Sequence, residues 1–284
     1  MAFSDWLRLA RIEHSFMVAI AVVAAEAVAA KSAGLPFDPL SVRALFPALG
    51  PFLITAAAFV LNDWFGVKTD KANRRKDRPL VSGKILRTDA LKAAVFLYAL
   101  GLLLAFYAGA AAFAIALAYA ALSLAYDPFL KKMPLAGNVF IASSMAISFL
   151  YGNFAVVPQV TEFVWLFVGI SFFAGVGREL LITLRDVKGD RKIRATTLPM
   201  LIGPRATAAL SISLFAWAMV LSWVPLYRGA GAAYLLCVLL NNALVLTVMF
   251  AVSRSTSPAV LKKARDLTLA ALVLGILAFA SLAL

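Results

Sequence analysis

Long apolar runs, separated by short polar segments, dominate the pattern of hydrophobic and polar positions along the chain. Each run has roughly the length that crosses a bilayer as a helix. The pattern predicts nine such helices, at residues 15–33, 46–66, 90–108, 111–126, 137–157, 162–184, 206–226, 231–252 and 267–283. The third and fourth lie in one apolar stretch, which we divide at Gly109. The predicted fold is therefore an all-α, polytopic membrane bundle of about nine transmembrane helices, with residues 1–284 forming a single domain.

The composition agrees with a membrane location. The chain is 63% hydrophobic and only 14% charged, which is unusual for a soluble domain. Its one cysteine, Cys237, lies within an apolar run, so the sequence offers no disulfide framework and no cysteine-based metal site. The first apolar run lacks a strongly basic leader, and we interpret it as the first membrane helix instead of a cleaved signal peptide.

The distribution of positive charge predicts the orientation in the membrane. The net charge of +13 would suggest a nucleic-acid partner in a soluble protein. Under the nine-helix topology, however, all 27 Lys and Arg residues except Lys31, Arg43 and Arg228 fall on one side. By the positive-inside rule, the N-terminus and the charged loops are cytoplasmic and the C-terminus is outside. The sequence thus predicts a multi-pass protein of the cell membrane, in contact with membrane lipids and not with nucleic acid.

Two charged clusters interrupt the apolar sequence in matching places. The first contains Asn62, Asp63 and Asp70 and leads into a basic loop, and the second occupies residues 178–191. Each lies at the end of an apolar run, and the two are roughly 120 residues apart, which resembles a weak internal repeat. We therefore expect the two helices to face each other across a central cavity. Because a carboxylate in lipid costs several kcal/mol, carboxylates beside surplus Arg and Lys indicate a divalent metal that carries a polyanion such as diphosphate.

The spacing of the carboxylates fits such a site. Asp186 and Asp190 are four residues apart and Asp63 and Asp70 are seven apart, so each pair shares a helix face. Mg²⁺ takes few protein oxygens and completes its shell with water and substrate phosphate. We predict Asp63, Asp70, Asp186 and Asp190 as catalytic residues that, with Asn62, bind Mg²⁺, and we predict that Arg74, Arg78, Lys188 and Arg191 neutralise the diphosphate. Such an arrangement would stabilise a departing diphosphate as an allylic carbon–oxygen bond ionises.

Other interpretations of the same residues remain open at this point. Basic loops also anchor helices to anionic lipid, and each carboxylate could have a structural Arg or Lys partner at the headgroup level. A transporter of an anionic phosphorylated solute would need intramembrane charges too, although broken helices at mid-membrane are common in such proteins. A purely structural membrane scaffold is the third alternative, and it leaves the carboxylates without a role.

At these residues the chain resembles the UbiA superfamily of intramembrane prenyltransferases. The stretch from Asn62 to Asp70 is similar to the family motif Asn-Asp-x-x-Asp-x-x-x-Asp, and Asp186 with Asp190 matches the second motif, Asp-x-x-x-Asp. The likeness runs from about residue 8 to residue 205. Further matches, which the resemblance implies for substrate binding, are Arg11, His14, Tyr126, Lys131 and Asn138.

The resemblance implies an activity and two substrates. Members of the superfamily use Mg²⁺ to move a prenyl group from a prenyl diphosphate to an acceptor. Residues 134–138 and the loop after Asn73 look most like the archaeal enzymes of ether-lipid synthesis. This similarity favours geranylgeranyl diphosphate as donor and geranylgeranylglyceryl phosphate as lipid acceptor. The alternatives are an aromatic acceptor of quinone biosynthesis (4-hydroxybenzoate or naphthoate) and, third, haem or chlorophyll prenylation.

One position departs from the family pattern. Gly66 stands where the first motif usually has its middle aspartate, so this chain lacks that metal ligand. Asp63 and Asp70 are about 10 Å apart along a helix, too far for one ion to bind both directly. The first site would then rely on Asn62 or Asp70, diphosphate and water. Glycine also weakens a helix interior by roughly 1 kcal/mol relative to alanine, so the helix is expected to bend or unwind most easily here.

Overall fold

The computed structural model describes residues 2–72, 75–192 and 196–284, without the side chains of Ala72, Lys188 and Lys192. Long α-helices make up most of this part of the chain. In order they are α2 (Ile12–Ser32), α3 (Val42–Ala72), α4 (Arg87–Tyr107), α5 (Ala110–Tyr126), α6 (Ala136–Phe154), α7 (Glu162–Lys192), α9 (Pro204–Leu221), α11 (Ala232–Arg254) and α12 (Pro258–Ser281). Short helices are α1 (Phe3–Leu9), α8 (Leu198–Ile202), α10 (Val224–Tyr227) and a 3-10 turn, η1 (Leu130–Lys132).

The all-α prediction is confirmed, and each predicted apolar range overlaps one of the long helices, although the range 206–226 also takes in most of α10. Seven helices of the described residues are long and apolar enough to cross a membrane, and α5 is a shorter apolar helix. The count of nine crossings is therefore approximate, because α5 is short and α6 carries polar residues such as Asn138 and Asn153. The apolar pattern did not predict α1, α8, α10 or η1.

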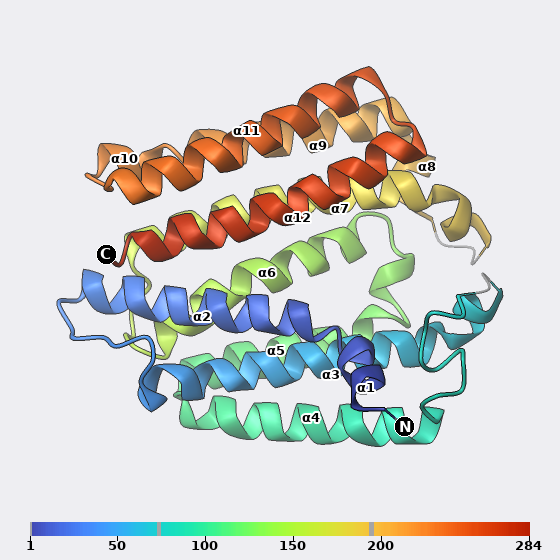
Figure 1. Cartoon of the computed structure of the whole chain (residues 1–284), viewed down its shortest axis with the longest axis horizontal. Coiled ribbons are helices and arrows are strands. Elements are labelled where there is room, and N and C mark those ends of the chain that lie inside the picture. Colours follow the sequence, from blue (N-terminus) through green and yellow to red (C-terminus); the bar gives the residue numbers. More distant parts are fainter. Residues whose placement is uncertain (1, 73–74, 193–195) are drawn as a thin grey trace.

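The helices lie side by side along the long axis of the molecule (Figure 1). Helix α3 packs against α4 and α2, α6 packs against α2 and α7, and α7 packs against α9 and α12. The C-terminal ends of α3 and α7, which carry the two charged clusters, reach the same end of the bundle. The N-terminus lies at that end and the C-terminus at the opposite end (Figure 1).

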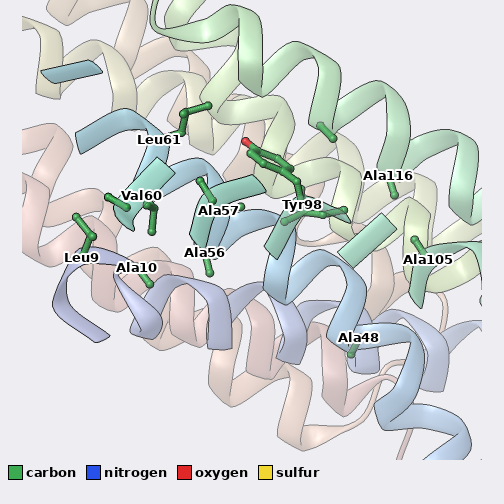
Figure 2. Packing of buried hydrophobic residues seen from close by; sticks show 14 of the residues in the cluster. Leu9, Ala10, Ala48, Ala56, Ala57, Val60, Leu61, Tyr98, Ala105 and Ala116 are labelled. Carbon is green, nitrogen blue, oxygen red and sulfur yellow. The ribbon is translucent and has the colours of Figure 1, made fainter. Parts of the chain in front are cut away.

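Small residues allow α3 and its neighbours to approach closely. Figure 2 shows Ala48, Ala56 and Ala57 of α3 within a cluster that also includes Tyr98 and Ala105 of α4. A Cβ atom added at Gly101 would come within 2.8 Å of Ile54 Cγ1 and 2.9 Å of the Gly50 carbonyl oxygen. Close backbone approach of this kind is how membrane helices gain van der Waals contact, since lipid supplies little hydrophobic driving force.

Helix α3 contains two prolines and is still one helix from Val42 to Ala72. Pro51 has no N–H to donate to the carbonyl of Pro47, which leaves that oxygen without its helical partner. The hydroxyl of Tyr151, on α6, donates a hydrogen bond to the same oxygen at 3.2 Å. A side chain from a neighbouring helix thus satisfies the polar group that proline leaves free inside the bundle.

Candidate active site

A cavity of about 720 Å³ lies within the bundle. Residues of α2, α3, α5, α6, α7, α9, α11 and α12 line it. Both motif helices take part: α3 contributes Thr55, Phe59 and Asn62, and α7 contributes the lining residues from Phe167 to Arg185. The prediction that these helices face a common central cavity is confirmed.

The lining changes from charged to apolar along the helices. Arg11, just before α2, lies at one end and Ala21 of α2 lies deeper in, and α12 presents Arg265 at the same end and Ile276 deeper in. Eleven residues of helix separate the two α12 positions, which is about 16 Å. The deep part is lined by aromatic and aliphatic side chains, among them Phe149, Phe167, Ile170, Phe215, Met219 and Leu272. The cavity therefore suits a molecule with an anionic head and an apolar tail.

Asp63 lies at the charged end of the cavity and is held by two arginines. The Nη1 atom of Arg78 donates to both carboxylate oxygens, at 2.9 and 3.1 Å. The Nη2 atom of Arg11 donates to Oδ1 at 2.9 Å. The Asp63 side chain is only 3% exposed, so this paired arrangement offsets the cost of burying its charge. Both arginines also line the cavity, and Arg78 Nε lies 4.0 Å from Asp70 Oδ2.

Arg11 has an unusual backbone. Its φ and ψ angles of 44° and 56° place it in the left-handed region, at the start of α2. This conformation costs a non-glycine residue on the order of 1 kcal/mol. It places the guanidinium 4.7 Å from the centre of the Phe59 ring and in contact with Asp63. His14, one turn further, also lines the cavity and packs edge-on against Phe59 at 5.2 Å.

Asp127 connects the first cluster to η1. Its Oδ1 atom accepts hydrogen bonds from Asn62 Nδ2 at 2.8 Å and from Lys131 Nζ at 3.1 Å. Burial raises the pKa of the Asp127 carboxyl group, and the charge and hydrogen bond of Lys131 oppose that shift. Tyr126, beside it, lines the cavity and stacks on Phe140. Asn62, Tyr126 and Lys131, all predicted as site residues, are thus brought to one wall of the cavity.

The second cluster continues as helix beyond the predicted end of its apolar run. Asp186 and Asp190 lie in α7, which confirms that they are one turn apart. Burial, and next the negative charge of Asp186, raise the pKa of Asp190 to about 6, while the charge of Lys131 lowers it. Arg185 donates to both oxygens of Asp186 at 2.7 Å and lines the cavity.

Four other residues were also predicted for the site. Two of them lie elsewhere in the described structure, and the other two are not fully described. Asn138 donates a hydrogen bond to the hydroxyl of Thr183 at 2.7 Å and so joins α6 to α7. Arg191 is exposed in the last turn of α7. Arg74 and the side chain of Lys188 lie outside the described residues.

The candidate ligands have the chemistry that a hard cation prefers, but they are not gathered into one dense cluster. Within residues 2–72, 75–192 and 196–284, no three His, Cys, Asp or Glu side chains come together closely enough to hold a metal ion. The candidate ligands are oxygen atoms, which Mg²⁺ prefers, and few protein ligands are typical of Mg²⁺ sites that include substrate phosphate. The mutual repulsion of Asp186 and Asp190 is the local feature that a bound cation would relieve.

Gly66 does not interrupt α3. The expectation of an unwound turn there is wrong, because the helix is continuous from Val42 to Ala72. Flanking turns and packing against α4 outweigh the roughly 1 kcal/mol that glycine costs. A Cβ atom added at Gly66 would meet Asp70 Oδ2 at 3.6 Å, which is ordinary van der Waals contact. The position can therefore accept a side chain that points toward Asp70.

Several cavity residues were missed as site residues. Arg75, Asp127, Arg178, Glu179, Arg185 and Arg265 all line the cavity. Arg178 and Glu179 open the second charged cluster at the end of an apolar run, which is the signal that the sequence offers for them. Arg265 lies in α12, far from both motifs in sequence, and only the folded bundle brings it to the cavity.

Fold and cavity together define a class: a multi-pass helical membrane protein with an internal cavity suited to an anionic, lipid-like molecule. Comparison with known proteins identifies the family. The chain belongs to the UbiA prenyltransferase family, whose model matches residues 17–272. It is therefore a prenyltransferase of that family, as the two aspartate motifs indicated.

Individual relatives cover nearly the whole chain. Digeranylgeranylglyceryl phosphate synthase of Archaeoglobus fulgidus is 32% identical over 275 residues, which is 95% of this chain and 92% of the relative. A solved structure of digeranylgeranylglyceryl phosphate synthase has a TM-score of 0.78 and 25% identity, and covers 99% of this chain and 98% of the other. A UbiA homologue from Archaeoglobus fulgidus, solved with GPP and Mg²⁺ bound, shares the fold with a TM-score of 0.68 at 18% identity, over 97% and 99% of the two chains.

Proposed function

We propose that this prenyltransferase moves a geranylgeranyl group from geranylgeranyl diphosphate to the free hydroxyl of geranylgeranylglyceryl phosphate, with Mg²⁺ as cofactor. The observation that carries the proposal is the cavity, which joins a cluster of arginines and aspartates to a long apolar interior. Both substrates are anionic at one end and apolar along the rest. The relatives named digeranylgeranylglyceryl phosphate synthase support this choice of acceptor.

The residues of the charged end have defined roles in this proposal. Arg11 and Arg78 face the cavity while Asp63 fixes their guanidinium groups, so two positive charges are held in place before the diphosphate arrives. Asn62, Asp63, Asp70, Asp186 and Asp190 would supply oxygen ligands for Mg²⁺. When bound, Mg²⁺ would neutralise negative charge that develops on the leaving diphosphate. Arg74, Lys188 and Arg191 are proposed to add positive charge near this end.

The reaction exchanges a bond to diphosphate for an ether bond. The bond between C1 of the prenyl chain and the diphosphate oxygen breaks, and the electron pair leaves with the diphosphate. The acceptor hydroxyl oxygen forms the new ether bond to C1 as its O–H bond breaks, and the proton passes to the released diphosphate or to water. Tyr126 and His14 line the cavity beside the charged end and would shape the pocket near C1, with the apolar interior enclosing the prenyl chain.

We also propose an orientation in the membrane. The end of the bundle that holds both clusters would be cytoplasmic, together with the N-terminus, and the C-terminus would be outside. The concentration of Lys and Arg at that end supports this orientation.

A competition among acceptors tests the function. Purified protein is incubated with labelled geranylgeranyl diphosphate, Mg²⁺ and equimolar geranylgeranylglyceryl phosphate, 4-hydroxybenzoate and a naphthoate acceptor, and the products are identified by mass spectrometry. We expect the glyceryl phosphate ether as the main product and none in EDTA. A prenylated aromatic product would contradict the acceptor, and a full rate in EDTA would contradict the cofactor. Uptake of the diphosphate into vesicles without product would indicate a transporter.

A further inference from the structure

A second group of arginines faces the cavity from outside the two aspartate motifs. Arg178 lies in α7 and Arg265 in α12, and these two helices pack against each other. Each arginine forms its hydrogen bonds with the acidic residue that follows it. Arg178 Nη1 donates to Glu179 at 3.1 Å, and Arg265 donates through Nε and Nη2 to Asp266 Oδ1 at 2.9 and 2.7 Å.

Arg178 is the more unusual of the two because it is deeply buried and one of its donor atoms makes no hydrogen bond. The residue is 9% exposed, and its Nε atom is buried with no hydrogen-bond partner among the described residues. A buried guanidinium with a free donor costs free energy unless a ligand supplies an acceptor. Among the charges that act on the same guanidinium, the carboxylate of Glu179 comes first, followed by the positive charges of Arg265 and Arg185, so an anion bound here would meet three arginines and one carboxylate.

Arg178 lies deeper in the cavity wall than the aspartates of the second motif. It precedes Asp186 by eight residues of α7, which places it about 12 Å farther along the helix toward the apolar interior. In the proposed reaction, C1 of the prenyl chain lies on the interior side of the diphosphate, and the acceptor hydroxyl must reach it there. The acceptor phosphate is attached to the same three-carbon glycerol as that hydroxyl, so it must lie at a similar depth.

We propose that Arg178 and Arg265 form a binding site for the phosphate of the acceptor, separate from the site for the prenyl diphosphate. This inference rests on the proposed function and adds the residues that recognise the acceptor. Arg178 donates its free Nε–H to a phosphate oxygen, and Arg265, which is 41% exposed in its side chain, contributes a second charge from the neighbouring helix. The enzyme thereby distinguishes a phosphorylated glycerol lipid from a neutral one.

The test measures each substrate separately in the full-length protein. Steady-state kinetics are recorded for wild type, Arg265→Gln and Arg178→Gln, with either geranylgeranyl diphosphate or the acceptor varied. The acceptor is used with its phosphate and as the neutral alcohol, geranylgeranylglycerol. Loss of a charge-assisted hydrogen bond should raise KM for the phosphorylated acceptor about tenfold or more and change KM for the diphosphate less than about twofold. The preference for the phosphorylated acceptor should fall by a similar factor.

Controls separate recognition from general damage. Arg254→Gln removes an exposed arginine at the same end of the bundle, on α11, and should leave all constants unchanged. Arg265→Lys keeps the charge and should recover part of the preference. Arg265→Gln is the primary variant because its carboxylate partner is half exposed, so folding should be preserved and is checked by thermal unfolding.

The outcomes distinguish the two proposals. If wild type makes the ether and the variants lose affinity for both substrates equally, or for neither, the phosphate site is wrong and the function stands. If wild type does not prenylate geranylgeranylglyceryl phosphate, the proposed function fails and this site fails with it. A selective loss for the phosphorylated acceptor supports both.

Discussion

At the scale of single residues, the main feature is the pairing of Asp63 with Arg11 and Arg78. One buried carboxylate holds two guanidinium groups at the mouth of the cavity, each within 3.1 Å. Asp63 is therefore proposed to position arginines as well as to bind metal. Such fixed charges need little rearrangement when the diphosphate binds, which is the usual source of electrostatic catalysis.

Replacing Arg78 tests its role in binding the donor. Arg78→Gln should raise KM for geranylgeranyl diphosphate about tenfold, because one charge-assisted contact is lost. Steady-state kinetics with the acceptor at saturation measure this. Lys76→Gln, an exposed cation two residues away, is the matched control and should be neutral. Unchanged kinetics of Arg78→Gln would assign this arginine a purely structural role.

Gly66 is the residue most particular to this chain. Gly66→Asp should lower the Mg²⁺ concentration for half-maximal activity, because the new carboxylate lies one turn from Asp70 on the same helix face. Gly66→Ala adds the Cβ atom without a ligand and is the control for the helix alone. Both variants are titrated with Mg²⁺ at fixed substrate. If folded Gly66→Asp needs as much Mg²⁺ as wild type, or more, the missing-ligand explanation is wrong.

The sequence predicted some of the site residues and missed others. Motif spacing identified Asn62 and Asp63, since their chemistry is unusual at the end of an apolar run. It did not identify Asp127, whose carboxylate joins Asn62 to Lys131, because nothing in the local sequence shows that residues 62 and 127 meet. Contacts between distant segments depend on helix packing, which a single sequence does not state.

At the scale of elements, α3 shows how a helix tolerates prolines within a bundle. The free carbonyl of Pro47 is satisfied from α6 by Tyr151, and this bond joins two helices that line the cavity. Apolar length predicted the centre of α3 well. It predicted the end poorly, since the helix continues past residue 66 to Ala72 through polar residues that hydropathy excludes.

Removing the tyrosine hydroxyl should destabilise the bundle. Tyr151→Phe leaves the Pro47 oxygen without a partner, which should cost about 1 kcal/mol and lower the unfolding temperature in detergent. Thermal unfolding with and without substrate measures the change. Tyr227→Phe alters a tyrosine that is 89% exposed and should have no effect. Equal stability of Tyr151→Phe and wild type would mean that the hydrogen bond contributes nothing to folding.

At the scale of the whole molecule, the two clusters and the N-terminus lie at one end of the bundle (Figure 1). The sequence predicted this arrangement from its charges. Lys and Arg are concentrated in alternate loops, and alternate loops of an up-and-down helical bundle lie at the same end. Cavity shape was not predictable in the same way. Its lining combines residues from eight helices, and the apolar pattern does not say which face of each helix turns inward.

Cysteine labelling tests the proposed orientation. In a Cys237→Ser background, Ala33→Cys should react with a membrane-impermeant maleimide on intact cells, since residue 33 follows α2 at the outer end. Lys263→Cys, in the first turns of α12, should react only after the cells are permeabilised. Mass shifts on a gel report both reactions. The reverse pattern would place the charged end outside and contradict the positive-inside interpretation.

The most direct test of the central claim, prenyl transfer to the free hydroxyl of the acceptor, uses an oxygen isotope label. Geranylgeranylglyceryl phosphate labelled with ¹⁸O in its free hydroxyl is incubated with purified protein, Mg²⁺ and unlabelled geranylgeranyl diphosphate. Because the bond between prenyl C1 and the diphosphate oxygen is the one that breaks, mass spectrometry should find all ¹⁸O in the new ether and none in the released diphosphate. Absence of the ether, or an ether that lacks the label, would contradict prenyl transfer to this hydroxyl.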